Sequence, residues 1–306
     1  MQERSTQNTM SYHSRLNKAF TGALRLPLNE SSKYVLISDC HRGVGNSNDN
    51  FLKNQHLYVA ALQHYFKNGY TYIELGDGDE LWENRDLKQI IEIHDDIFEM
   101  LAGFYKRNRL YMIYGNHDMV KKNTRYAAKS CESCHCCNNV HCYWDKQPLF
   151  PNIKFYEGII LQKNYPRSED DMDVYLTHGH QAELLNSVFW RTARFLVRYV
   201  WGPLERVGVL DPTSAAKNNV RKHASEKRLQ KWAEDEKHIL ITGHTHRPAL
   251  NDSDKYYINS GSCVHPRCIT CLEIECLQIR LVKWTMTARG DMSLAVSKEV
   301  LESRNL

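Results

Sequence analysis

Five short polar motifs hold the residues whose types and spacing could do chemistry in this chain of 306 residues. Together they offer carboxylate oxygens, imidazole nitrogens and one amide oxygen, a mixed donor set that suits Mn, Fe(II) or Zn. About seven ligands are too many for one tetrahedral ion, whereas they fit two ions that share a carboxylate. The motifs are Asp39-x-His41, Gly76-Asp77, Gly115-Asn116-His117-Asp118, His178-Gly179-His180 and Gly243-His244-Thr245-His246.

Each motif follows an apolar run that is typical of a buried β-strand. Helical patterns over residues 51–67 and about 88–107 separate the first three runs, and this alternation predicts βαβ units with parallel strands. Ligands of such sheets bind beyond the carboxyl ends of the strands, so the motifs are expected to meet at one edge. A single Gly-Asp is usually a turn, but five such motifs in order are not expected by chance.

Taken together, the motifs resemble those of the calcineurin-like metallophosphoesterase superfamily. The similar segments are DCH at 39–41, GDGDE at 76–80, GNHD at 115–118, HGH at 178–180 and GHTH at 243–246. The resemblance covers roughly residues 34–285 and implies an α/β fold, namely a four-layer α/β/β/α sandwich with a dinuclear metal centre. It implies that one ion is bound by Asp39, His41 and His246, and the other by Asn116, His178 and His244, with Asp77 bridging both.

The same resemblance implies catalytic roles for two further residues. His117 would lie beside the scissile phosphoryl group, and Glu80 would orient it. The implied function is metal-dependent hydrolysis of phosphoester or phosphoanhydride bonds by a bridging hydroxide. Two divalent ions are expected, with manganese favoured over iron or zinc.

Two alternative functions are considered beside this one. A protein Ser/Thr phosphatase-like enzyme would read GDxVDRG where this chain reads GDGDELW. A catalytically silent metal-binding scaffold would usually have lost a ligand, and every ligand position is filled here. The segments GDGDELW and GHTHRP look more like UDP-2,3-diacylglucosamine hydrolases, although those enzymes have GNRD in place of GNHD. A phosphorylated small molecule, nucleotide-linked or lipid-linked, is therefore the expected substrate.

The chain divides into three parts by its polarity and by the pattern of its apolar residues. Residues 1–32 read as a polar N-terminal extension, 33–290 as the catalytic domain and 291–306 as a C-terminal tail. Two segments interrupt the catalytic domain: a Cys-rich insert at 130–142 and a helical cap at 182–236. In the insert, Cys131, Cys134, Cys136 and Cys137 could hold a structural zinc ion, and the alternative is a reduced loop.

The cap is expected to contact substrate. Arg191, Arg194 and Arg198 form a basic stripe at helical spacing and are predicted to bind phosphate groups. The residues Leu185, Val188, Phe189, Thr192, Phe195, Leu196 and Tyr199 form an apolar face of the same helix. The alternatives are an ordinary amphipathic helix packed on the core, or a peripheral contact with an anionic membrane.

Composition excludes several classes of protein. No window reaches the roughly 18 apolar residues of a membrane span, and the first thirty residues lack the apolar core of a signal peptide. We therefore expect a cytoplasmic protein, with a peripheral position at the membrane as the alternative. The net charge of +4 is too small to predict nucleic-acid binding.

Overall fold

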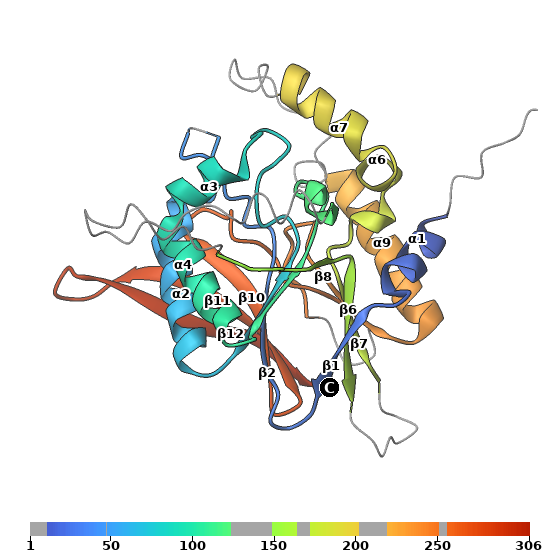
Figure 1. Cartoon of the computed structure of the whole chain (residues 1–306). Helices are drawn as coiled ribbons and strands as arrows, with labels where there is room; N and C mark the ends of the chain where they lie inside the picture. Colours follow the sequence, from blue (N-terminus) through green and yellow to red (C-terminus); the bar gives the residue numbers. More distant parts are fainter. Residues whose placement is uncertain (1–10, 47, 124–148, 164–171, 202–218, 251–255) are drawn as a thin grey trace, which may run out of the picture.

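Two stacked β-sheets carry helices on their outer faces, which gives the α/β/β/α layers expected from the sequence (Figure 1). The computed structural model describes residues 11–46, 48–123, 149–163, 172–201, 219–250 and 256–306. The Cys-rich insert and its candidate zinc ligands lie outside the described residues.

The larger sheet has seven strands in the order β12-β11-β10-β2-β3-β4-β5. From β2 to β5 the strands run parallel, and β10, β11 and β12 extend the sheet with antiparallel pairs. The parallel half therefore brings the carboxyl ends of β2, β3 and β4 to one edge. The strands are β2 (Lys33–Ile37), β3 (Thr71–Leu75), β4 (Leu110–Ile113), β5 (Phe155–Tyr156), β10 (Cys268–Glu275), β11 (Gln278–Ala288) and β12 (Leu294–Asn305).

The smaller sheet has five strands in the order β1-β6-β7-β8-β9. Its β7, β8 and β9 run parallel to one another, so the ends of β7 and β8 also meet at one edge. The strands are β1 (Leu24–Leu28), β6 (Gly158–Lys163), β7 (Val174–Thr177), β8 (Ile239–Thr242) and β9 (Tyr257–Asn259).

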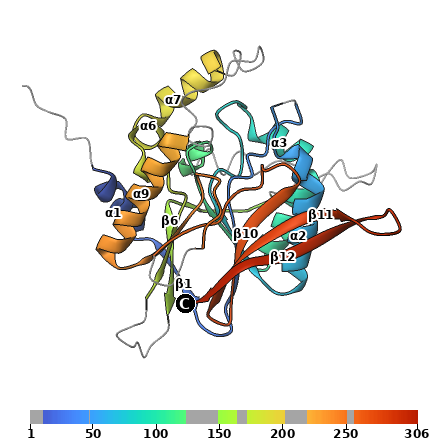
Figure 2. The same ribbon diagram turned by 180° about the vertical axis from the view of Figure 1, so that it is seen from behind.

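Helices cover both outer faces, as the two views in Figures 1 and 2 show. On the larger sheet lie α2 (Gln55–Lys67), α3 (Leu87–Ile93) and α4 (Asp95–Lys106), and on the smaller sheet lie α1 (Tyr12–Phe20) and α9 (Asn219–Glu236). Single turns of 3₁₀-helix occur at η1 (Leu52–Asn54), η2 (Met119–Lys122) and η3 (His180–Ala182).

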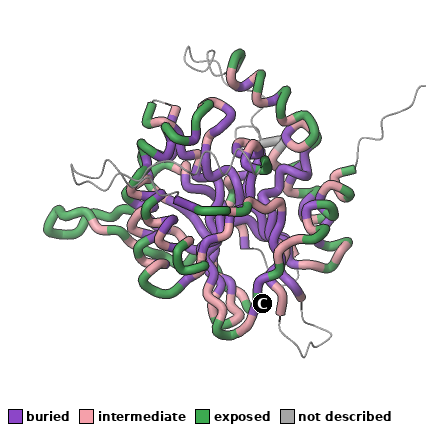
Figure 3. The backbone as a smooth tube through the Cα atoms, viewed as in Figure 1, coloured by how far each residue is buried: buried purple, intermediate pink, exposed green. Residues whose placement is uncertain are grey.

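Three apolar clusters fill the spaces between the four layers, and their residues form the buried interior in Figure 3. Tyr58 and Leu62 belong to the cluster beneath α2, and Leu36 and Ile241 belong to the cluster between the two sheets. Trp232 belongs to the third, beneath α9. The strands that end in the polar motifs are buried on both faces because each sheet lies between two layers.

The structure differs from the sequence-based expectation at both ends of the chain. Within the segment expected as an extension, α1 packs on the smaller sheet and β1 pairs in parallel with β6. Within the segment expected as a tail, β12 pairs with β11 over its whole length. Most side chains of β12 are exposed at the edge of the sheet. The strand therefore does not need the alternation of apolar and polar residues that predicts a half-buried strand.

The helical segment between β7 and β8 rises above the site edge of the two sheets (Figure 1). Its described helices are α6 (Leu184–Ser187), α7 (Trp190–Leu196), the π-helix η4 (Val197–Trp201) and α9. Residues 202–218 of the predicted cap lie outside the described residues. Among the described helices, none is long and apolar enough to cross a membrane.

A buried network of charges ties the loops that follow β2, β3 and β4. Arg42 donates to Glu74 at 2.9 Å and to Asp79 at 2.7 Å. Lys121 then donates to Asp79 at 2.6 Å and to Asp118 at 2.7 Å. All five side chains are buried, so each charge depends on its partners to offset its lost hydration.

We expect Lys121→Met to lower the free energy of unfolding by about 3–5 kcal/mol, because it leaves the buried carboxylate of Asp118 without its cation and that of Asp79 with Arg42 alone. Urea denaturation measures this cost. The matched control is the neighbouring Lys122→Met: that side chain is 59% exposed, compared with 2% for Lys121, and it pairs only at the surface with Glu157. The control should cost less than about 1 kcal/mol, and equal costs for the two variants would contradict the role of the network.

Candidate metal centre

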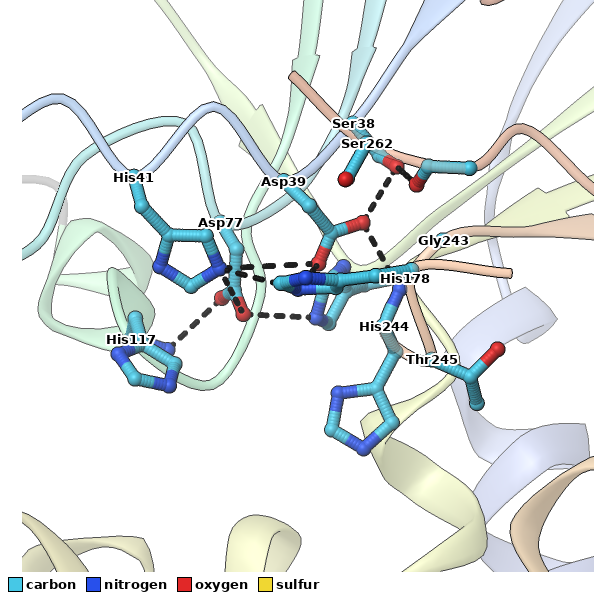
Figure 4. A network of polar contacts seen from close by, with 12 residues as sticks. Ser38, Asp39, His41, Asp77, His117, His178, Gly243, His244, Thr245 and Ser262 are labelled. Atoms are coloured by element: carbon cyan, nitrogen blue, oxygen red, sulfur yellow. Dashed lines mark hydrogen bonds and ion pairs between the residues drawn. The ribbon is translucent and has the colours of Figure 1, made fainter. Parts of the chain in front are cut away.

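The five motifs meet where the carboxyl ends of β2, β3, β4, β7 and β8 come together. Figure 4 shows Asp39, His41, Asp77 and His178 pointing toward one another from three of these ends, those of β2, β3 and β7. Three overlapping groups of side chains there have ligand atoms within 4.8 Å of one another, and each group could hold a metal ion. The groups are Asp39, His41 and His246; His41, Asp77 and His117; and Asp77, His178 and His244.

The first group joins the loop after β2 to the loop after β8. Nε2 of His246 lies 3.0 Å from Oδ1 of Asp39 and 3.3 Å from Nε2 of His41. Oδ2 of Asp39 accepts the backbone N–H of His244 at 2.9 Å, whereas the buried Oδ1 accepts no hydrogen bond from the described residues. A buried carboxylate oxygen that accepts no hydrogen bond and lies beside two imidazole nitrogens fits a metal cation, because carboxylate and imidazole groups bind the same cation together.

A second set of donors, Asp77, Asn116 and His178, joins the loops after β3, β4 and β7. Nδ1 of His178 faces the backbone oxygen of Leu75 at 2.9 Å, and a hydrogen bond to that carbonyl leaves the lone pair on Nε2. Nε2 lies 3.1 Å from Oδ2 of Asp77 and 3.2 Å from the amide oxygen of Asn116. Asn116 is therefore in reach of the same point as the carboxylate and the imidazole.

Asp77 lies between the two groups. Its Oδ2 is 3.8 Å from Nε2 of His41 on one side and 3.1 Å from Nε2 of His178 on the other. Its Oδ1 accepts the backbone N–H of His117 at 2.8 Å, which anchors the loop after β4 to the loop after β3. The position matches a carboxylate that two ions could share.

The backbone at the site is strained in the same way at five donor residues. Each has a positive φ, between 50° and 69°, a region that non-glycine residues avoid. Such residues cost about 1–3 kcal/mol each and cluster at functional sites, where surrounding contacts hold them. The five residues are Asp39, His41, Asp77, His244 and His246.

Two glycines allow the motif loops to approach one another this closely. A Cβ on Gly115 would lie 2.1 Å from Oδ1 of Asp77, and one on Gly243 would lie 2.3 Å from Oδ2 of Asp39. Any larger residue at these positions would displace a carboxylate of the site. The glycines of GNHD and GHTH are thus required by the packing of the loops and not only by their turns.

Glu80 contacts two histidines of the site. Its carboxylate lies 2.8 Å from Nδ1 of His117 and 2.9 Å from Nδ1 of His41. Both rings therefore direct Nε2 away from Glu80. The sequence predicts the contact with His117, whereas the contact with His41 comes from the tertiary structure.

Buried carboxylates set the electrostatics of the site. Burial by itself would raise the pKa of Asp77, but His178 and His117 outweigh it and hold the pKa well below its usual range. Burial would likewise lower the pKa of His117, but Glu80 and Asp77 raise it above its usual value. Asp77 is therefore ionised at neutral pH, and the imidazolium form of His117 is favoured.

Trp82 is a site residue that the sequence analysis missed. Its indole stacks on the imidazole of His117, with 4.3 Å between ring centroids and 21° between planes. Trp82 also packs with Ala193 and Val197 of the helical insertion. The residue stands within the GDGDELW segment, but its periodicity cannot reveal a stacking partner from another loop.

The three arginines expected to bind substrate lie in different surroundings. Arg198 donates to the backbone oxygens of Leu81, Trp82 and Asn84, so it anchors the insertion to the loop after β3. Arg191 and Arg194 lie over the ring of Trp190, at 5.5 and 4.9 Å from its centroid. The segment from α6 to η4 exposes Val188, Phe189, Phe195 and Tyr199 from the expected apolar face.

The chain matches a known protein family: a family model described as calcineurin-like phosphoesterase matches residues 32–248. Comparison with curated proteins finds no significant match. Among solved structures, an uncharacterised protein of Streptococcus pneumoniae that is itself a predicted phosphoesterase is 13% identical, with a TM-score of 0.33. That alignment covers 88% of this chain and 97% of the other chain. Vps29 from Chaetomium thermophilum is 11% identical, with a TM-score of 0.39, over 90% of this chain and 98% of that chain.

Proposed function

The chain belongs to the calcineurin-like phosphoesterase family, and on that premise we propose that it hydrolyses phosphoester or phosphoanhydride bonds with a dinuclear metal centre. The observation that carries the proposal is the position of Asp77, whose buried carboxylate lies between two groups of buried and half-buried donors. Such a placement has little structural purpose without cations, because it leaves a charge and several imidazoles in a strained, buried cluster.

The ligand sets follow the grouping of the donors. We assign Asp39, His41 and His246 to one ion, and Asn116, His178 and His244 to the other, with Asp77 shared. Mixed nitrogen and oxygen donors favour Mn²⁺, with iron or zinc as alternatives. When bound, two such cations neutralise phosphoryl oxygens and lower the pKa of a water molecule.

The side chains around His117 supply the remaining chemistry. Glu80 holds Nδ1 and favours the imidazolium, so Nε2–H is available to a leaving oxygen or to an equatorial phosphoryl oxygen. Trp82 covers one face of the ring and prevents it from rotating away. Glu80 also fixes His41, so one carboxylate aligns a metal ligand and the proton donor.

The helical insertion supports a substrate with anionic and apolar parts. Arg191 and Arg194 lie on α7, which also carries the exposed Phe195 and packs against Trp82 through Ala193. A nucleotide-linked or lipid-linked phosphate, as in UDP-2,3-diacylglucosamine hydrolases, fits such a surface, and a peripheral contact with an anionic membrane would supply a lipid-linked one.

Asp77→Ala should reduce bound metal from two ions per chain to one or none and abolish hydrolysis of a nitrophenyl phosphate, because it removes the shared ligand. Elemental analysis after loading with Mn²⁺, together with an absorbance assay on mono- and bis-nitrophenyl phosphate, measures both. Asp49→Asn is the matched control, since Asp49 is buried beside His94 outside the metal groups. If the wild-type protein binds two ions but hydrolyses neither the nitrophenyl phosphates nor phosphopeptides, it is a silent scaffold. If it prefers phosphopeptides, the protein phosphatase alternative is favoured.

His117→Ala should lower kcat by roughly 10²–10⁴ while bound metal stays unchanged, because His117 acts as the proton donor and not as a main ligand. The loss should be larger for an alkyl phosphate than for nitrophenyl phosphate, whose leaving group scarcely needs a proton. Asn116→Ala is the comparison, because it should lose one ion. Loss of metal from His117→Ala, with activity restored by excess Mn²⁺, would make His117 a ligand instead.

Replacing Arg191 and Arg194 together with Ala should raise KM for a nucleotide-linked or lipid-linked phosphoester by about tenfold, the worth of one charge-assisted hydrogen bond. Turnover of nitrophenyl phosphate should change little. Arg198→Ala serves as the contrast. It should lower the turnover of both substrates, because Arg198 holds the loop that carries Trp82. Equal effects of the double variant on both substrates would remove the insertion from substrate recognition.

A further inference from the structure

Glu183 connects the metal centre to the helical insertion. It directly follows η3 and precedes α6, and its side chain is largely buried. Oε1 lies 3.1 Å from Nε2 of His244 and accepts the hydroxyl of Ser225 on α9 at 2.6 Å. Oε2 accepts the side-chain amide of Asn186 on α6 at 2.7 Å. One carboxylate thus contacts a candidate metal ligand and both ends of the insertion.

The contact with His244 determines which ring nitrogen can bind a metal. A carboxylate that also accepts bonds from Ser225 and Asn186 has to act as an acceptor toward His244, so Nε2 carries the proton. The lone pair then lies on Nδ1, on the side of the ring away from Glu183. The backbone N–H of His244 is bonded to Asp39, and its φ is 69°, so the residue is held from two sides.

The insertion in turn holds Glu183 in place. Arg228 of α9 donates to the backbone oxygen of Ala182, next to Glu183, at 3.0 Å. Leu229 and Trp232 of the same helix are buried with Ala182 on the smaller sheet. Ser225 belongs to this packed part of α9 and is itself buried. A shift of α9 would therefore move a partner of Glu183 and disturb His244.

We propose that Glu183 is a positioning residue that fixes the tautomer of His244 and couples metal occupancy to the packing of α6 and α9. This inference rests on the metal centre proposed above. Partners of this kind behind a ligating histidine change metal affinity by about 10–100-fold. Because coupling between sites is reciprocal, a ligand that moves α6 or α9 would change metal affinity by the same factor that metal changes its binding.

Mn²⁺ titration by calorimetry, with metal content after dialysis, tests the first part of the proposal. Glu183→Ala should weaken one of the two sites by about 10–100-fold and leave the other nearly unchanged. Glu183→Gln keeps an oxygen acceptor of the same shape, so it should fold even if Glu183→Ala does not, and it should lose less affinity. The matched control is Glu226→Gln, next to Ser225 on α9, because Glu226 pairs with Arg247 and His223 and with none of the proposed metal ligands. It should retain wild-type affinity at both sites.

Hydrogen exchange tests the coupling without reference to activity. Mn²⁺ should slow exchange in residues 184–187 and 225–236 of the wild type, and this protection should be reduced in Glu183→Gln. Wild type that binds no Mn²⁺ would overturn the metal centre and with it this inference. Two intact sites and unchanged protection in both Glu183 variants would overturn the role of Glu183 alone, because the metal centre would then stand without it.

Discussion

The buried carboxylate of Asp77 has imidazoles on two sides, with His178 at 3.1 Å and His41 at 3.8 Å, and it also accepts the backbone N–H of His117. An ionised group in such a place is costly unless positive charge and hydrogen bonds compensate it. The loops after β2, β3, β4 and β7 have to reach one point to provide them. Stacked sheets whose parallel strands end at a common edge satisfy that requirement.

The layers behind the site hold this arrangement together. Positive φ angles at the donor residues are unfavourable in isolation, so other contacts have to stabilise the loops. The buried network from Arg42 through Asp79 to Lys121 stabilises them, since it ties three of the loops to one another. Gly115 and Gly243 permit the remaining close approaches. Stability and site geometry are therefore carried by the same residues.

The helical insertion is part of the site and does not merely cover it. It reaches the centre at two separate points: Trp82 and Arg198 join it to the loop that carries Glu80, and Glu183 joins it to His244. Under the proposed function, the element that would contact the substrate would also align the proposed catalytic groups. This arrangement offers a physical reason for placing an insertion between the last two motifs.

The sequence by itself determined the donor types, their order and their positions after apolar runs, and these predicted βαβ units and the meeting of five motifs. The four-layer fold was implied by the family resemblance that the motifs carry. Only the tertiary structure decided which atoms face one another. Glu80 is shared between two histidines, Trp82 stacks on His117 and Arg198 turns to backbone oxygens. The edge strand β12 and the packed N-terminal segment also escaped the sequence patterns. The physical reason is that periodicity reports which side of one segment is buried, whereas partners from distant segments are selected by the packing of the whole chain.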